Sequence, residues 1–127
     1  MKTVKIMLKR IGCIALCLLL LNGTVNATIF TALLSGNFSS SATWGGVAPA
    51  SLLTSDVVII PAGITVTLDG DQSFTGTSSL LVNGTLTSGA YATSLVMTGG
   101  TLSGTGVVIL DSMVMNMASG FTYTGSL

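Results

Sequence analysis

Charged side chains almost disappear from this sequence after its tenth residue, and this restricts what can hold a fold together. The four basic residues stand at positions 2, 5, 9 and 10, and the acidic ones are Asp56, Asp69, Asp71 and Asp111. Residues 28–127 contain no Lys, Arg, His, Cys or Glu. Such a segment must be stabilised by buried apolar side chains and backbone hydrogen bonds.

The charge that remains excludes two classes of partner. Residues 28–127 carry about −4 at neutral pH, because aspartate is ionised there. A nucleic-acid-binding protein needs basic side chains to neutralise phosphates, and this segment has none. Binding to anionic membrane surfaces is excluded for the same reason.

The first 27 residues have the order of a secretory signal peptide. Basic residues precede an apolar run from Ile11 to Leu21, and the small-residue site Val25-Asn26-Ala27 follows. As a helix the run would span about 16 Å, whereas a bilayer core is about 30 Å thick. We therefore expect residues 1–27 to be removed, a secreted or cell-surface protein, and no membrane span after cleavage.

Both cysteines, Cys13 and Cys17, lie inside this apolar run. Leu16 precedes Cys17 and Arg10 stands three places before Cys13, so neither fits a lipoprotein site. We expect no lipid anchor, and no disulfide in the processed chain.

The remaining sequence has the pattern of β-strands. Ile64, Val66 and Leu68 alternate with threonines, which places the three apolar side chains on one face of a strand. Four consecutive β-branched residues, Val57 to Ile60, predict a strand that is covered on both faces. No window after Ala27 has helical spacing, and the many Gly, Ser and Thr residues oppose helix interiors. We expect an all-β fold.

A short pattern of apolar, polar, glycine, hydroxyl and leucine residues occurs three times, ending at Leu86, Leu102 and Leu127. It predicts a strand end, a tight bend that needs glycine, and a new strand with its leucine inward. The leucines are 16 and 25 residues apart, so they define no regular period. Short strands and glycine bends favour a β-solenoid. A β-sandwich is the alternative, with Asn83-Gly84 as its one hairpin dipeptide.

The order of motifs resembles the N-terminal region of secreted right-handed parallel β-helix surface proteins of Bacteroidetes-type bacteria. These proteins are pectin-lyase-like, and they are similar in style to the eight-glycine domain. The motifs that carry the resemblance are Phe38 after Gly-Asn, Ala42-Thr43-Trp44, Pro49 before Asp56, Val58-x-Ile60-Pro61-x-Gly63, Val66 to Asp69, Asn83 to Leu86, and the glycine-rich stretch 99–106. Phe38 departs from the family pattern, which has tryptophan there.

The resemblance implies a single-stranded right-handed parallel β-helix fragment. Its parts are a helical signal peptide at 1–27, an N-terminal cap at 28–56 and solenoid coils at 57–127, incomplete at the C-terminus. We expect Trp44 to be a packed lid residue, because lone large aromatics mostly bury area. An open last coil would also allow self-association.

Two hypotheses for function follow from the resemblance. The first is a non-catalytic structural or adhesive repeat module at the cell surface, with carbohydrate or another surface protein as partner. The alternative is the N-terminal fragment of a β-helix polysaccharide-degrading enzyme whose active site lies outside this chain.

Asp69 and Asp71 are the one candidate for chemistry in the sequence. They could form a carboxylate pair, but an Asp-Gly-Asp sequence is also an ordinary turn, and no cationic residue is present to stabilise a developing anion. Together with Ser73 they have the alternate spacing of calcium ligands, although Phe74 and Leu80 replace the glycine and glutamate of the full loop. We expect no catalytic residues, no enzyme activity and no cofactor, with calcium as a weak candidate.

Overall fold

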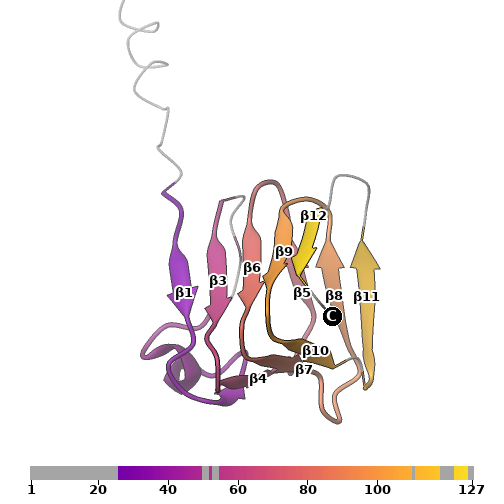
Figure 1. Ribbon diagram of the computed structural model, residues 1–127. Helices are drawn as coiled ribbons and strands as arrows, with labels where there is room; N and C mark the ends of the chain where they lie inside the picture. Colours follow the sequence, from indigo (N-terminus) through magenta and orange to yellow (C-terminus); the bar gives the residue numbers. More distant parts are fainter. Residues whose placement is uncertain (1–25, 50–51, 53–54, 110, 118–121, 126–127) are drawn as a thin grey trace, which may run out of the picture.

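The computed structural model describes residues 26–49, 52, 55–109, 111–117 and 122–125 (Figure 1). The predicted signal peptide lies outside these residues except for its last two positions, so its helix stays a prediction. Within the described ranges, no helix has the length and apolar character needed to cross a membrane.

The described chain is all-β, as the sequence predicts. It consists of twelve short strands and one turn of 3-10 helix. In chain order these are β1 (Ile29–Thr31), β2 (Gly36–Asn37), η1 (Ser41–Trp44), β3 (Val57–Ile60), β4 (Thr65–Thr67), β5 (Gln72–Phe74), β6 (Ser79–Val82), β7 (Thr85–Thr87), β8 (Thr93–Met97), β9 (Thr101–Gly104), β10 (Val107–Ile109), β11 (Met113–Met117) and β12 (Thr122–Gly125).

The strands form three parallel sheets. Sheet A has the order β1-β3-β6-β9-β12, sheet B the order β10-β7-β4-β2, and sheet C the order β11-β8-β5. All pairings between described strands are parallel, so the β-sandwich alternative, which requires antiparallel sheets, is wrong. This topology is consistent with a β-solenoid.

The chain visits sheets A, B and C in turn, and we call each such passage a circuit (Figure 1). Circuit 1 covers residues 29–56, with η1 in place of a strand in sheet C. Circuit 2 covers 57–78, circuit 3 covers 79–100 and circuit 4 covers 101–117, and β12 returns to sheet A.

The register reveals a period that the three leucines do not. Leu80 pairs with Leu102 in sheet A, and Leu86 pairs with Val108 in sheet B, each 22 positions further along the chain. Leu86 and Leu102 are both buried and inward, as predicted, but they lie in different sheets. Their spacing of 16 residues therefore measures the path between two sheets and not the length of a circuit.

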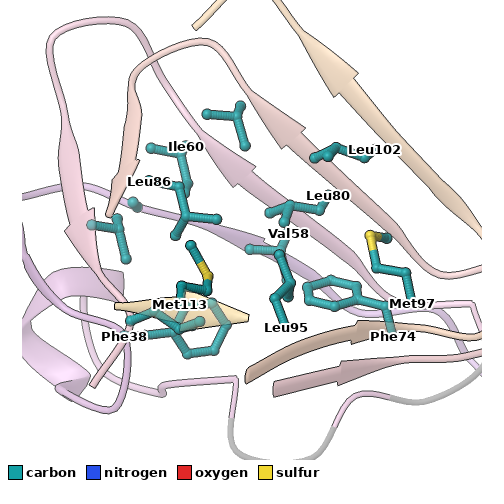
Figure 2. Packing of buried hydrophobic residues seen from close by; sticks show 14 of the residues in the cluster. Phe38, Val58, Ile60, Phe74, Leu80, Leu86, Leu95, Met97, Leu102 and Met113 are labelled. Carbon is teal, nitrogen blue, oxygen red and sulfur yellow. The ribbon is translucent and has the colours of Figure 1, made fainter. Parts of the chain in front are cut away.

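Inward side chains from all three sheets form one core (Figure 2). Its members include Phe38, Val58, Ile60, Val66, Leu68, Phe74, Leu80, Leu86, Leu95, Met97, Leu102 and Met113. In β3, Val58 and Ile60 are buried, whereas Val57 and Ile59 are only half-buried. The prediction that this strand is covered on both faces is wrong, because sheet A packs on the core with one face.

Circuit 1 covers one end of the core with an aromatic pair. The rings of Phe38 and Trp44 meet edge to face, with their centroids 5.2 Å apart and an angle of 71° between their planes. The indole N–H of Trp44 donates a hydrogen bond of 2.8 Å to the carbonyl oxygen of Phe38. Trp44 is buried, so it is the packed residue that the sequence predicts.

Glycine allows successive circuits to stack at the bend between sheets A and B. A Cβ atom on Gly84, between β6 and β7, would overlap the carbonyl oxygens of Pro61 and Ile64 in circuit 2. A Cβ atom on Gly106, one circuit later, would overlap the carbonyl oxygen of Gly84. Because Gly84 and Gly106 have no side chain, the backbones of neighbouring circuits can approach each other closely at this bend.

Candidate functional site

Asp69 lies in the bend between β4 and β5 and reaches back to circuit 1. One carboxylate oxygen accepts a hydrogen bond of 3.0 Å from the backbone N–H of Ser39, and the other accepts one of 2.5 Å from the hydroxyl of Ser39. Ser39 follows β2 and is 30 positions earlier in the chain. The carboxylate therefore links circuit 2 to circuit 1.

These contacts determine the protonation of Asp69. Partial burial raises its pKa, but hydrogen bonds from the Ser39 side chain and backbone, from its own backbone N–H and from the Asn37 side chain outweigh this effect. The net result is a pKa below the ordinary value for aspartate. The folded protein thus favours the ionised form, as expected for a carboxylate that accepts several hydrogen bonds.

Asp71 reaches in the other direction. Its Oδ1 atom accepts a hydrogen bond of 2.8 Å from the backbone N–H of Ser94, in β8 of circuit 3. Ser73, the third calcium candidate, is exposed on β5 and pairs with Val96. Asp69 and Asp71 are therefore bonded to circuits on opposite sides of their own.

This arrangement gives Asp69 and Asp71 a clear structural role. Each carboxylate satisfies a backbone N–H of a neighbouring circuit, which is the ordinary use of a polar group at a bend. Among the described residues, no group of three or more His, Cys, Asp or Glu side chains is placed to hold a metal ion. Calcium binding through Asp69, Asp71 and Ser73 stays a prediction.

Two further bends have a side-chain oxygen that accepts a hydrogen bond from a distant backbone N–H, and no pattern in the sequence indicated them. The buried Asp56 accepts a hydrogen bond of 2.8 Å from the backbone N–H of Thr28. The side-chain oxygen of Asn83 accepts one of 3.2 Å from the backbone N–H of Thr105 in circuit 4. The partners are 28 and 22 positions apart, so only the circuit length could have indicated them.

The outer face of sheet B carries a regular set of hydroxyl groups. Thr65 and Thr67 of β4 pair with Thr85 and Thr87 of β7, and the residues between them are buried. The threonines therefore form two outward rows. Neighbouring strands are about 4.8 Å apart and alternate residues on a strand about 6.6 Å apart, which fixes the spacing of the rows.

Residues other than threonine occupy the next positions of these rows at both ends. In circuit 1, Asn37 occupies the position next to Thr67. In circuit 4, Val107 and Ile109 occupy the positions next to Thr85 and Thr87. The threonine signal is visible in the sequence as Thr-x-Thr at 65–67 and again at 85–87, but its outward position follows only from the register.

The two sets of residues have different capacities. The aspartates are used within the fold. The threonine rows offer hydroxyl donors and acceptors to a ligand, and within them the Thr87 hydroxyl also accepts a hydrogen bond of 3.0 Å from the backbone N–H of Gly89. Comparisons with models of protein families, with curated proteins and with solved structures find no match for this chain.

Proposed function

We propose that this chain is the N-terminal region of a secreted right-handed parallel β-helix protein of the Bacteroidetes-type surface class. Three features support this fold: parallel sheets, strands that return to each sheet in the same order, and core rows that from circuit 2 onward repeat after 20 to 22 positions in sheets A and B. The right hand follows from the general preference of parallel strand crossovers.

The protein would act as a non-catalytic structural and adhesive module. The observation that carries this function is the pair of threonine rows on sheet B, Thr65 with Thr85 and Thr67 with Thr87. Hydroxyl groups at fixed spacing can exchange hydrogen bonds with the hydroxyls of a glycan, which is the partner we propose. Asp69 and Asp71 are bonded to neighbouring circuits, and Asp56 is bonded to the backbone of Thr28 before β1, which supports a structural role for these acids.

A glycan array with matched variants tests this function. The double variant Thr65→Val and Thr85→Val removes two hydroxyls from sheet B but keeps the β-branched shape. The control, Ser79→Ala with Thr101→Ala, removes the paired hydroxyls from the outer face of sheet A. We expect the wild type and the control to bind the same glycans and the sheet B variant to lose binding. Binding of no glycan by the wild type, or equal loss in both variants, would refute the adhesive role.

Export is tested separately. We expect a bacterial host to release a protein that begins at Thr28, because the proposed signal peptide ends at Ala27. Retention of residues 1–27 on the released protein would contradict this part of the proposal without affecting the glycan test.

A further inference from the structure

Asp56, directly before β3, is the one buried acid among the described residues. It is 2% exposed, whereas Asp69 is half-buried and Asp71 and Asp111 are exposed. A buried carboxylate is costly unless a cation or hydrogen bonds compensate for the lost water. Residues 28–127 contain no Lys, Arg or His, so no side chain of this segment can supply a cation.

The backbone nitrogen of Thr28 lies against this carboxylate. It donates a hydrogen bond of 2.8 Å to the Oδ1 atom of Asp56. The carbonyl oxygen of Thr28 accepts one of 2.9 Å from the backbone N–H of Val57, and the next residue, Ile29 of β1, pairs with Val57 of β3. Because β1 and β3 are neighbours in sheet A (Figure 1), their ladder fixes the Thr28 nitrogen beside Asp56.

The Thr28 nitrogen is also the atom that removal of the predicted signal peptide would free. Hydrolysis of the bond between Ala27 and Thr28 adds a hydroxyl group to the Ala27 carbonyl carbon and a proton to the Thr28 nitrogen. The new α-amine is largely protonated at neutral pH, so it takes up a further proton from solvent. As an ammonium group it would be the only positive charge in residues 28–127.

We propose that signal-peptide removal creates an ion pair between the Thr28 ammonium group and the Asp56 carboxylate, and that this pair stabilises β1 on sheet A. The inference rests on the proposed cleavage after Ala27. Before cleavage, Asp56 accepts a hydrogen bond from a neutral amide. After cleavage, a full positive charge occupies the same position, and charge-assisted hydrogen bonds are roughly twice as strong as neutral ones.

The exposure of the two partners favours this pair. Asp56 is buried by the fold itself, so its loss of water does not depend on cleavage. Thr28 is exposed, so its ammonium group keeps contact with water. The desolvation cost that weakens many buried ion pairs is therefore small for the new charge. Stability that is gained only on cleavage would favour folding after export.

Acetylation of the released protein tests the pair, because it removes the charge of the terminal amine but keeps an N–H that can donate to Asp56. Residues 28–127 contain no lysine, so an amine-selective reagent has one target. Wild type, Asp56→Asn and the control Asp69→Asn are compared with and without the acetyl group by urea denaturation. Asp69 bonds to Ser39, so its variant removes an equal charge at another bend.

We expect acetylation to lower the folding equilibrium constant of the wild type and of Asp69→Asn by about tenfold, and that of Asp56→Asn much less. A second measurement does not require Asp56→Asn to fold. The amine of the folded wild type should react more slowly with the reagent than the amine of the protein in urea, because the ion pair keeps it protonated.

Three results would overturn the proposal: unchanged stability of the acetylated wild type, an equal effect of acetylation in Asp56→Asn, and an amine that reacts equally fast in the folded and unfolded wild type. Mass spectrometry shows separately where the released protein begins. A start at a residue other than Thr28 would refute the proposed cleavage together with the pair. Glycan binding by sheet B is a third readout, so failure of the adhesive function is distinguishable from both.

Discussion

Neighbouring circuits contact each other in different ways at two corners of the molecule. At the corner between sheets A and B, Gly84 and Gly106 let one circuit lie directly on the backbone of the previous one. The side chain of Asn83 adds a hydrogen bond to Thr105 at this corner. At the corner between sheets B and C, side chains span the gap between circuits. There Asp69 bonds to Ser39, and Asp71 to Ser94.

The difference shows what limits each corner. At the first corner the space between circuits is the limit, because a Cβ atom on Gly84 or Gly106 would overlap backbone oxygens. At the second corner the contact between circuits depends on hydrogen bonds and not on space, because a Cβ atom on Gly70 would have no heavy atom within 4 Å. We expect the first corner to reject small changes of shape and the second to respond to changes of polarity.

The largest effect is expected from Gly84→Ala. The new methyl group would press on the carbonyl oxygens of Pro61 and Ile64. Overpacking that shifts the backbone typically costs about 1–3 kcal/mol of unfolding free energy, and we expect the upper end of this range because two backbone oxygens are in the way. Gly70→Ala is the control, because Gly70 has open space and no left-handed backbone angle. Urea denaturation of both variants is the measurement. Equal loss of stability would remove the distinction between the corners.

Asp69→Ala tests the polar corner. It removes the acceptor for both hydrogen bonds from Ser39, and at this partly exposed bend we expect a loss of about 1–2 kcal/mol. Asp69→Asn keeps an oxygen acceptor of the same shape and should lose less. If chemical denaturation finds the two variants equally unstable, acceptor chemistry does not explain this corner.

Thr93 follows the polar corner at the start of β8 and offers a test of opposite sign. Its hydroxyl oxygen is buried and has no hydrogen-bond partner in the described part of the chain. Thr93→Val keeps the shape and removes the unsatisfied group, so thermal unfolding should show a gain of about 1 kcal/mol. In the matched change Thr43→Val, the hydroxyl that donates to the Asn37 carbonyl is lost, and stability should fall.

The smallest effect concerns pH. The pKa of Asp69 is lower in the folded protein than its ordinary value, so the folded state favours the carboxylate. Its contribution to stability is therefore present above the ordinary pKa of aspartate and is lost as the pH falls through the lowered pKa. Unfolding free energy measured across this acidic range should show a dependence on pH that Ser39→Ala reduces. An unchanged dependence in that variant would contradict the assigned cause.

The sequence predicted the local structure better than the circuits. The alternation at 64–68 correctly indicated a strand with Val66 and Leu68 inward, because strand alternation depends only on neighbouring residues. The circuit length was missed because Leu86 and Leu102 follow similar glycine bends at different corners. Val57 and Ile59 led to the wrong prediction that both faces of their strand are covered. The reason is that β-branched residues suit a strand whether or not both of its faces are covered.

The candidate site was predicted only in part. Asp69 and Asp71 were identified from their spacing, but their partners, Ser39 and Ser94, are 30 and 23 positions away. Interactions at such distances depend on which circuits become neighbours. The outward threonine rows likewise required the register, because Thr-x-Thr alone does not say which face of a strand is buried.

The central claim is that parallel circuits about 22 residues long stack in register, and nuclear Overhauser contacts between backbone protons test it most directly. We predict contacts between the strands that contain Ser79 and Thr101, Thr85 and Val107, and Leu95 and Met115, with the pattern of parallel pairs. Close contacts between opposed α-protons, which mark antiparallel neighbours, would contradict the account.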